Sequence, residues 1–148
     1  MIVHVLGIEV EIDETVIDAP TTEIDRQVEA YLAGERREFD LPVRYPEGFT
    51  GEVMRAIASI PYGETRTYGQ LAEQIGSAPR AVGGGCGRNP IPIVVPCHRV
   101  VRSDGGLGGF SAGGDRGLDL KRALLDFEAG VAHSSEDSPS STLRRIST

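Results

Sequence analysis

The feature that most constrains this chain is a pair of short helices joined by a tight turn. Thr67 and Gln70 stand three residues apart, the spacing of a capping box, in which each side chain satisfies a free backbone N–H at the start of a helix. That helix is expected over residues 68–75 and ends at Gly76. A second helix is expected over residues 80–88, after a short turn. Two short helices with a glycine in the turn between them favour a helix-turn-helix, a motif that binds DNA.

The segments before this helix pair have the patterns of a small α+β unit. Apolar residues at 8, 10 and 12 alternate with acidic ones, which predicts a half-buried strand, and residues 2–6 are expected to pair with it. Pro20 opens a helix whose apolar face includes Tyr31, and Gly34 ends it. Residues 41–48 are predicted to be an extended linker.

Two further elements flank the helix pair. A helix over about 50–60 is expected to have Thr50 as its N-cap, with Phe49 and Met54 in contact as a hydrophobic staple. The apolar residues 91–95 are bounded by prolines and predict a short buried strand.

The C-terminal third is predicted to contain one helix between irregular segments. Residues 103–106 have the composition of a hairpin turn, and residues 108–114 that of a flexible loop. A last helix is expected over 115–129. The Ser-rich residues 131–148 predict a disordered tail.

The second helix of the pair is unusually rich in glycine. Glycines stand at 83, 84, 85 and 87, and each costs about 1 kcal/mol relative to alanine in a helix interior. Because they lack a side chain, they let the helix backbone approach another group closely. A phosphate–sugar strand of DNA and a tightly packed neighbouring helix fit this feature equally well.

The composition is that of a globular protein with unevenly distributed charge. Apolar residues make up 39% and charged residues 25% of the chain. There is no run of about 20 apolar residues and no signal-peptide pattern, so a reducing intracellular compartment and no membrane partner are expected. The net charge is −7, to which residues 1–47 contribute −8 and residues 48–130 contribute +1. The middle segment is therefore not repelled by a polyanion such as DNA.

Cys97 is the sharpest candidate for chemistry. A free cysteine is most often an inert buried side chain, but this one follows Pro96 and precedes His98. A thiol with a pKa near 8.5 is only a few per cent thiolate at neutral pH, and a nearby imidazole can act as the base that it needs. On an ideal strand the two side chains would point to opposite faces, so the pair can work together only if the chain turns there.

Metal binding is a weak interpretation of the same residue types. Cys86 and Cys97 stand eleven residues apart and the three histidines are scattered, so no spacing resembles a zinc site. Cys86 is expected to be a packing residue.

Several spaced segments together resemble a known family. The run Ile-Pro-Ile-Val-Val-Pro-Cys-His-Arg-Val-Val at 91–101 is similar to the active-site signature of the O6-alkylguanine-DNA alkyltransferases, also called methylated-DNA–protein-cysteine methyltransferases. Residues 60–72 are similar to the stretch that begins the helix-turn-helix of that family. The other similar segments are residues 80–84, 87–90, 108–111 and 124–128, so the resemblance covers about residues 40–130.

This resemblance implies roles for five catalytic residues. Cys97 would accept the alkyl group of a damaged guanine, His98 would take the thiol proton through a water, and Glu128 would orient His98. Tyr68 would donate to guanine N3, so that the base leaves as a neutral species. Asn89 would link the helix-turn-helix to the active-site turn.

The resemblance also implies a set of residues that contact the substrate or DNA. Arg80 would enter the duplex and fill the gap left by the extruded base. The carbonyl of Val100 would accept from the exocyclic amine, as would that of Cys97. Ser111 would contact the O6 atom, and Phe110 would form a flat wall for the base. The further residues expected at the DNA are Thr67, Gly84 and Arg88.

The implied fold is α+β with two parts and a tail. Residues 1–45 would be a truncated ribonuclease-H-like N-terminal α/β part with a linker, and residues 46–130 a winged helix-turn-helix-like alkyltransferase domain. Residues 131–148 would be the tail.

The implied function is DNA repair by irreversible, single-turnover transfer of an alkyl group to Cys97. The substrate would be O6-alkylguanine in double-stranded DNA, with O4-alkylthymine as a further candidate. The protein would be a cytoplasmic monomer without cofactor or metal.

Three alternatives remain open at this stage. A non-catalytic module that binds alkylated bases would lack the acceptor cysteine. A Cys-His hydrolase would turn over repeatedly without DNA, and a plain helix-turn-helix regulator would leave residues 96–100 unexplained.

Overall fold

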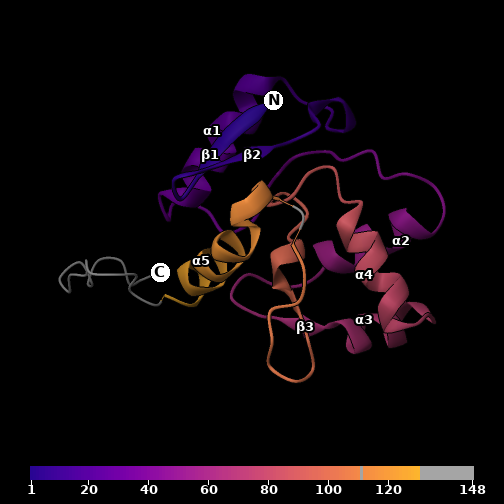
Figure 1. The fold of residues 1–148 in the computed structure, drawn as a ribbon. Helices are drawn as coiled ribbons and strands as arrows, with labels where there is room; N and C mark the ends of the chain where they lie inside the picture. The colour runs from indigo at the N-terminus through magenta and orange to yellow at the C-terminus, as the bar shows by residue number, and fades with distance from the viewer. Residues whose placement is uncertain (111, 131–148) are drawn as a thin grey trace.

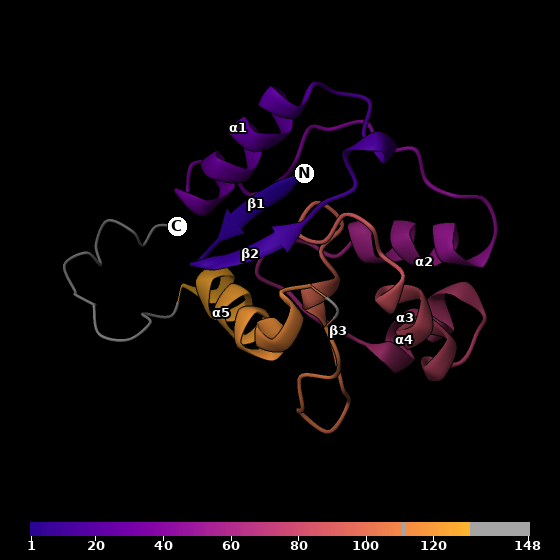
Figure 2. The ribbon, with the colours of Figure 1, turned by 45° about the horizontal axis from the view of Figure 1, so that its top comes forward.

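The N-terminal part is a small hairpin with a helix beside it (Figures 1 and 2), in a computed structural model that describes residues 1–110 and 112–130. β1 (Ile2–Val5) pairs antiparallel with β2 (Ile8–Glu11) through a two-residue turn at Leu6 and Gly7, both with positive φ. After a 3₁₀ turn at Glu14–Val16, α1 (Thr21–Leu32) packs against β1. The strand pair and the helix predicted from the sequence are confirmed.

The predicted helix pair is confirmed at its exact start. α3 (Tyr68–Ile75) begins at a capping box, in which Gln70 N–H donates to Thr67 Oγ1 at 3.0 Å and Thr67 N–H donates to Gln70 Oε1 at 2.8 Å. Gly76 ends it in the left-handed conformation, with φ 70°. α4 (Pro79–Gly87) follows and packs against α3, and both helices contact α2 (Phe49–Ala58).

The predicted start of α2 is wrong by two residues. Gly48, with φ 85°, occupies the N-cap position, and Phe49 is the first helical residue. The staple between Phe49 and Met54 is therefore not formed, because it requires the apolar residue before the cap. The Thr50 hydroxyl accepts instead from Arg88 Nε at 3.0 Å, which ties α2 to the end of α4.

Residues 91–95 are buried but do not form the predicted strand. Ile93 has φ 78°, and Val95 N–H donates to the Ile91 carbonyl at 3.0 Å, so the chain makes a turn. Pro90 and Pro92 cannot donate to a ladder, and a short apolar run by itself does not distinguish a strand from other buried segments.

The segment after this turn carries the centre of the molecule. A 3₁₀ turn at Cys97–Arg99 leads into β4 (Val100–Val101), which pairs parallel with β3 (Arg66–Thr67), just before α3. No pattern in the sequence predicted this pairing. Arg102 N–H donates to the Gly106 carbonyl at 2.9 Å, which confirms a turn but without the two strands of a hairpin.

The last described element is α5 (Gly117–Ala129), which follows a 3₁₀ turn at Gly114–Arg116. It confirms the predicted helix with a slightly later start, and it buries Leu120 and Leu124 completely. The predicted tail at 131–148 lies outside the described residues.

One hydrophobic core joins the N-terminal part to the rest of the chain. Residues of β1, β2 and α1 belong to the same buried cluster as those of α2, α3, α4 and α5. A backbone hydrogen bond from Asp13 N–H to the Pro90 carbonyl, at 3.0 Å, also connects β2 to the turn before the active-site segment. The N-terminal part is therefore positioned against the segments that carry Cys97 and α5.

Some glycines of α4 permit close helix packing, and others leave the helix backbone open to another molecule. A Cβ on Gly85 would lie 2.8 Å from a methyl group of Val53, so this glycine permits close packing of α4 on α2. A Cβ on Gly87 would meet nothing within 4 Å, and one on Gly83 only the edge of the Tyr68 ring at 3.9 Å. These two glycines border open space on the side of the helix that faces the cavity described below.

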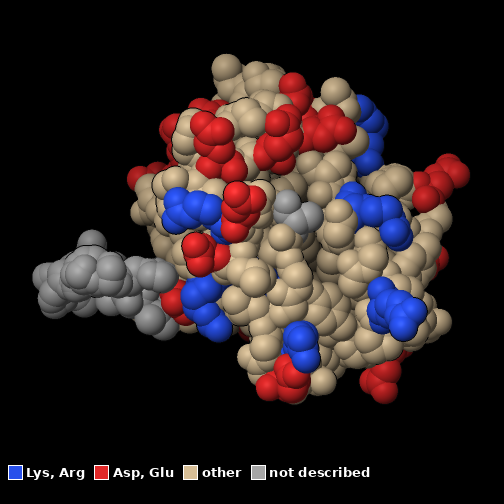
Figure 3. All heavy atoms as spheres, in the orientation of Figure 1, with Lys and Arg blue, Asp and Glu red and all other residues tan. Residues whose placement is uncertain are grey.

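Acidic side chains gather over the N-terminal part, at the top of the view in Figure 3. The exposed acidic residues of this part include Glu9, Glu11 and Asp13. The lower part of the same face is mostly uncharged, with separate arginines. In the described part of the chain, no helix is long and apolar enough to cross a membrane.

Candidate active site

A cavity of about 650 Å³ brings together residues from four parts of the chain. Tyr68 comes from the first turn of α3, Arg80 from the first turn of α4, Cys97 from the 3₁₀ turn and Phe110 from the loop before α5. The remaining lining residues are Pro79, Gly83, Cys86, Gly87, Arg102, Gly108 and Gly109. Four of the residues singled out in the sequence therefore share one cavity.

Cys97 lies at the inner wall of this cavity with 4% of its surface exposed. Asn89 Nδ2 donates to Cys97 Sγ at 3.3 Å and to the Val95 carbonyl at 2.8 Å, while Asn89 Oδ1 accepts from Ile91 N–H at 3.0 Å. Asn89 thus fixes the turn that precedes the cysteine and holds the sulfur in place. Burial raises the pKa of the Cys97 thiol, and the Asn89 hydrogen bond and the charge of Lys121 oppose this only in part.

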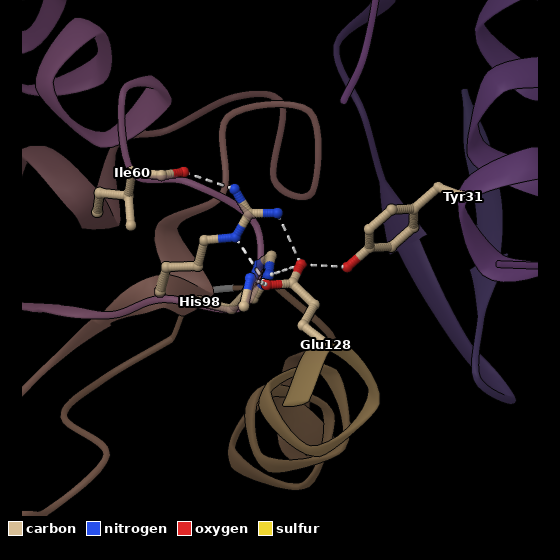
Figure 4. A network of polar contacts seen from close by, with 6 residues as sticks. Tyr31, Ile60, His98 and Glu128 are labelled. Carbon is tan, nitrogen blue, oxygen red and sulfur yellow. Dashed lines mark hydrogen bonds and ion pairs between the residues drawn. The ribbon is translucent and has the colours of Figure 1, made fainter. Parts of the chain in front are cut away.

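The chain turns between Cys97 and His98, as a cooperating pair requires. His98 is completely buried, and its Nε2 lies 2.8 Å from Glu128 Oε2 (Figure 4). Because the carboxylate can only accept, we assign the ring hydrogen to Nε2, which leaves a lone pair on Nδ1. Among the described residues Nδ1 has no hydrogen-bond partner. Burial lowers the pKa of His98 more than Glu128 raises it, which favours the neutral imidazole.

Glu128 is the centre of a buried polar network. Arg99 donates to it twice, from Nε to Oε1 at 2.7 Å and from Nη2 to Oε2 at 2.8 Å, and its Nη1 donates to the Ile60 carbonyl at 2.8 Å. The Tyr31 hydroxyl donates to Oε2 at 2.5 Å from the opposite side (Figure 4). Burial by itself would raise the pKa of Glu128, but the hydrogen bonds and charges of His98 and Arg99 outweigh it and lower the pKa well below the usual range.

Tyr68 faces the cavity as a neutral hydroxyl. Burial raises the pKa of Tyr68 to about 12, and the two nearby cysteines raise it as well. A hydrogen bond from the Gly109 backbone lowers it only in part. Gly108, with φ 76°, passes so close that a Cβ there would lie 2.6 Å from the Tyr68 hydroxyl oxygen. Lys121 Nζ lies 5.8 Å from the centre of the Tyr68 ring and donates to the Gly109 carbonyl at 3.0 Å.

The other residues expected at the substrate lie around the mouth of the cavity or next to it. Arg80 is exposed and makes no hydrogen bond or ion pair within residues 1–110 and 112–130. Val100 is buried in β4, where its neighbour Val101 lies opposite Thr67 of β3. Gly84 and Arg88 are exposed on α4, and the guanidinium of Arg88 is held by Thr50. Ser111 lies outside the described residues.

Three residues of the site were not found from the sequence: Tyr31, Arg99 and Lys121. Lys121 is the only lysine of the chain, and it has no exposed surface although it is charged. The sequence does contain a signal that Lys121 is buried, because positions 121 and 128 fall on the same face of the helix as the apolar Leu124. No such local signal marks Tyr31, which lies 97 residues from its partner.

The described residues contain no group of three or more His, Cys, Asp or Glu side chains placed to hold a metal ion. The site itself presents a thiol, an imidazole, a carboxylate and a phenol, from Cys97, His98, Glu128 and Tyr68.

Residues 48–130, which carry most of this site, match the family model of the 6-O-methylguanine DNA methyltransferase DNA-binding domain. The chain belongs to this family. It is 51% identical over 110 residues to a methylated-DNA–protein-cysteine methyltransferase of Methanosarcina acetivorans, with 72% of this chain and 67% of the relative covered. It is 56% identical over 106 residues to that of Mycolicibacterium paratuberculosis, with 69% and 61% covered.

Solved structures of the family are similar to this fold over part of their length. The structure of Mycobacterium tuberculosis OGT in complex with DNA superposes with a TM-score of 0.67 at 47% identity, over 73% of this chain and 66% of that one. The match thus spans about two thirds or less of the length of these relatives. Tyr31 lies before the segment that matches the methyltransferase family model, whereas His98, Arg99 and Glu128 lie within it.

Proposed function

We propose that this protein repairs DNA by moving an alkyl group from the O6 atom of guanine to Cys97, once per molecule. One observation carries the proposal: the Cys97 sulfur lies in the wall of a cavity lined by Tyr68, and the next residue, His98, is paired with a buried carboxylate. The methyltransferase relatives and the DNA complex of the M. tuberculosis protein support it. O6-alkylguanine is the proposed substrate, with O4-alkylthymine as a second candidate.

The first part of the reaction is removal of the thiol proton. Because burial raises the pKa of Cys97, the resting sulfur is protonated, and a base must act as the substrate reacts. Nδ1 of His98 takes the proton through a water, and the resulting imidazolium is stabilised by Glu128, to which Nε2–H donates. The positive charge of Lys121, also close to the sulfur, favours the thiolate.

The second part is displacement at the alkyl carbon. The sulfur forms a bond to this carbon as the bond from carbon to O6 breaks, and the electron pair of that bond passes to the guanine ring. Tyr68 O–H donates a proton to N3, so the base departs neutral, and the proton held by His98 restores the phenol through solvent. The products are guanine and a thioether on Cys97. The thioether makes the transfer irreversible and limits each molecule to one turnover, without metal or cofactor.

A buried sulfur can reach the O6 position only if the nucleotide is rotated out of the duplex. Arg80, exposed and unpaired at the start of α4, is proposed to fill the gap, because a planar guanidinium can replace a stacked base. Gly83 and Gly87 leave the backbone of α4 open on the cavity side, which permits close approach of a phosphate–sugar strand. Thr67, Gly84 and Arg88 are proposed to lie along the same DNA surface.

The remaining contacts to the base are proposed for Cys97, Val100, Phe110 and Ser111. Phe110 forms a flat wall, the carbonyls of Cys97 and Val100 accept from the exocyclic amine, and Ser111 contacts O6. Asn89 keeps the active-site turn in place.

The finer architecture belongs to the same proposal. We infer that residues 1–45 are a shortened form of a ribonuclease-H-like part and that residues 46–130 form a winged helix-turn-helix-like alkyltransferase domain. The protein is proposed to act as a monomer in the cytoplasm. The mixed helix and sheet structure and its likeness to the solved methyltransferases support this arrangement.

Peptide mapping after reaction tests the proposal. The protein is incubated with duplex DNA that contains O6-methylguanine, digested, and analysed by mass spectrometry. One added methylene on the Cys97 peptide is expected, absent in Cys97→Ala and still on Cys97 in Cys86→Ser, which removes the other cysteine of the cavity. Bound DNA with unmodified Cys97 would identify a binding module instead, and repeated turnover on a thioester or amide without DNA would identify a hydrolase.

A further inference from the structure

Tyr31 reaches the His98–Glu128 pair from outside the segment that matches the family model. It lies in the last turn of α1, has 1% of its surface exposed, and donates its hydroxyl to Glu128 Oε2 at 2.5 Å. Figure 4 shows its ring pointing at the carboxylate from the side opposite to His98. The family model begins at residue 48, so this contact is made by the part of the chain that precedes it.

The hydroxyl of Tyr31 can act only as a hydrogen-bond donor to this carboxylate. Burial raises the pKa of Tyr31 far above its usual range, and the negative charge of Glu128 raises it further. The phenol is therefore protonated in the pH range in which a histidine titrates. The ring is held by Phe39, Tyr62 and Phe127, with centroid distances of 5.4, 6.1 and 5.5 Å.

The same oxygen that accepts from Tyr31 also accepts from His98. Oε2 lies 2.8 Å from His98 Nε2 and 2.8 Å from Arg99 Nη2, so three donors share it. A hydrogen bond to the charged form of a carboxylate stabilises that form and reduces its attraction for another proton. Loss of the Tyr31 donor would leave more negative charge on Oε2 to hold a proton on His98.

We propose that Tyr31 is a positioning residue for alkyl transfer: by donating to Glu128 Oε2 it limits how strongly the carboxylate holds the imidazolium of His98. The N-terminal part thereby sets the pH range in which His98 is a free base. This inference rests on the proposed function, because it assigns Tyr31 a role in the same proton transfer.

Other charged and titratable groups also surround the pair. Arg99 faces Glu128 from the 3₁₀ turn. Lys121, on α5, lies close enough for its charge to act on His98. Tyr62 faces the carboxylate from the turn after α2, with Arg37 over its ring at 4.9 Å. All of them stay in place when only the Tyr31 hydroxyl is removed, so a change in pH dependence can be assigned to that hydroxyl.

Tyr31→Phe removes the hydroxyl and keeps the ring that packs in the cluster. Single-turnover rates with free O6-benzylguanine are measured from pH 5 to pH 9 for the wild type and the variant. We expect the acidic limb of the profile to move up by about 0.5 to 1 pH unit, which is a loss of rate of about three- to tenfold at the pH where His98 is mostly protonated. At high pH the rates should converge.

Tyr62→Phe is the matched control. It removes a hydroxyl from the neighbouring ring, which in the described part of the chain makes no hydrogen bond with Glu128, and the wild-type profile is expected. A second variant carries 3-fluorotyrosine at position 31, a stronger donor of the same shape, and the acidic limb should move the other way.

An unshifted acidic limb in both position-31 variants, with rates lowered equally at all pH values or not at all, would overturn the role of Tyr31. This outcome is distinct from failure of the proposed function, in which the wild type itself would not alkylate Cys97.

Discussion

Removal of the charge on Glu128 is expected to lower the stability of the protein strongly. In Glu128→Gln the side chain keeps its shape, but an amide replaces a carboxylate that accepts five hydrogen bonds, two of them from Arg99. The Arg99 guanidinium, with 6% of its residue surface exposed, loses its counter-charge and keeps only neutral acceptors, namely the Ile60 carbonyl and the single oxygen of the new amide. Breaking a buried ion pair in this way costs about 3–5 kcal/mol.

The expected loss is large relative to the total stability of a domain of this size, which is roughly 5–15 kcal/mol. With each kcal/mol worth about 3–5 °C in melting temperature, the Tm of Glu128→Gln should fall by about 10–20 °C at pH 7. Thermal unfolding followed by circular dichroism measures this shift. Glu64→Gln is the matched control, because Glu64 forms an exposed ion pair with Arg66 at 3.1 Å, and its Tm should change by less than about 2 °C.

The difference in Tm between the wild type and Glu128→Gln is also expected to depend on pH. The pKa of Glu128 is lowered in the folded protein, so its contribution is complete above the unfolded value of about 4.3 and is lost as the pH falls towards the folded pKa. The gap in Tm between the wild type and Glu128→Gln should therefore narrow below about pH 4. A Glu128→Gln protein that melts within about 3 °C of the wild type at pH 7 would refute the reasoning.

Three further substitutions have defined outcomes. Lys121→Met should slow single-turnover alkyl transfer at pH 7 by about tenfold, because the positive charge that lowers the pKa of the Cys97 thiol is lost while burial still raises it. An unchanged rate would contradict this. Arg80→Ala should slow repair of duplex DNA at least about tenfold more than reaction with free O6-benzylguanine, and equal losses would exclude a role in base extrusion. Urea unfolding should show Gly85→Ala destabilised by about 1–3 kcal/mol and Gly87→Ala stabilised by up to about 1 kcal/mol, and the reverse order would refute the division of these glycines.

Signals confined to a few residues predicted the fold well. The alternation at residues 8–12 and the capping box of Thr67 and Gln70 depend on near neighbours, and both elements formed as expected. The predicted Thr50 cap was wrong because Gly48 begins the helix two residues earlier, and no local pattern indicates that Arg88 donates to the Thr50 hydroxyl. The buried strand at 91–95 failed because burial of an apolar run does not fix its backbone, and Ile93 has a positive φ.

The candidate site was predicted only where the motif itself carries the chemistry. Cys97 and His98 are adjacent in the sequence, and the roles of Glu128 and Tyr68 were predicted from the family resemblance. The structure places Cys97 and Tyr68 in one cavity and pairs His98 with Glu128. The donors that surround Glu128 come from separate elements that meet only in the folded chain. Tyr31 is the clearest case, since its role depends on α1 packing beside α5, which no local pattern indicates.

The stoichiometry of transfer tests the central claim most directly. A known amount of protein is mixed with an excess of duplex DNA carrying O6-methylguanine with an isotopically labelled methyl group, and label on protein and loss of lesion are counted together. We expect both to stop at one methyl group per chain, with the protein inactive towards a second addition of DNA. Continued loss of lesion beyond one per chain, or loss without label on the protein, would contradict the account.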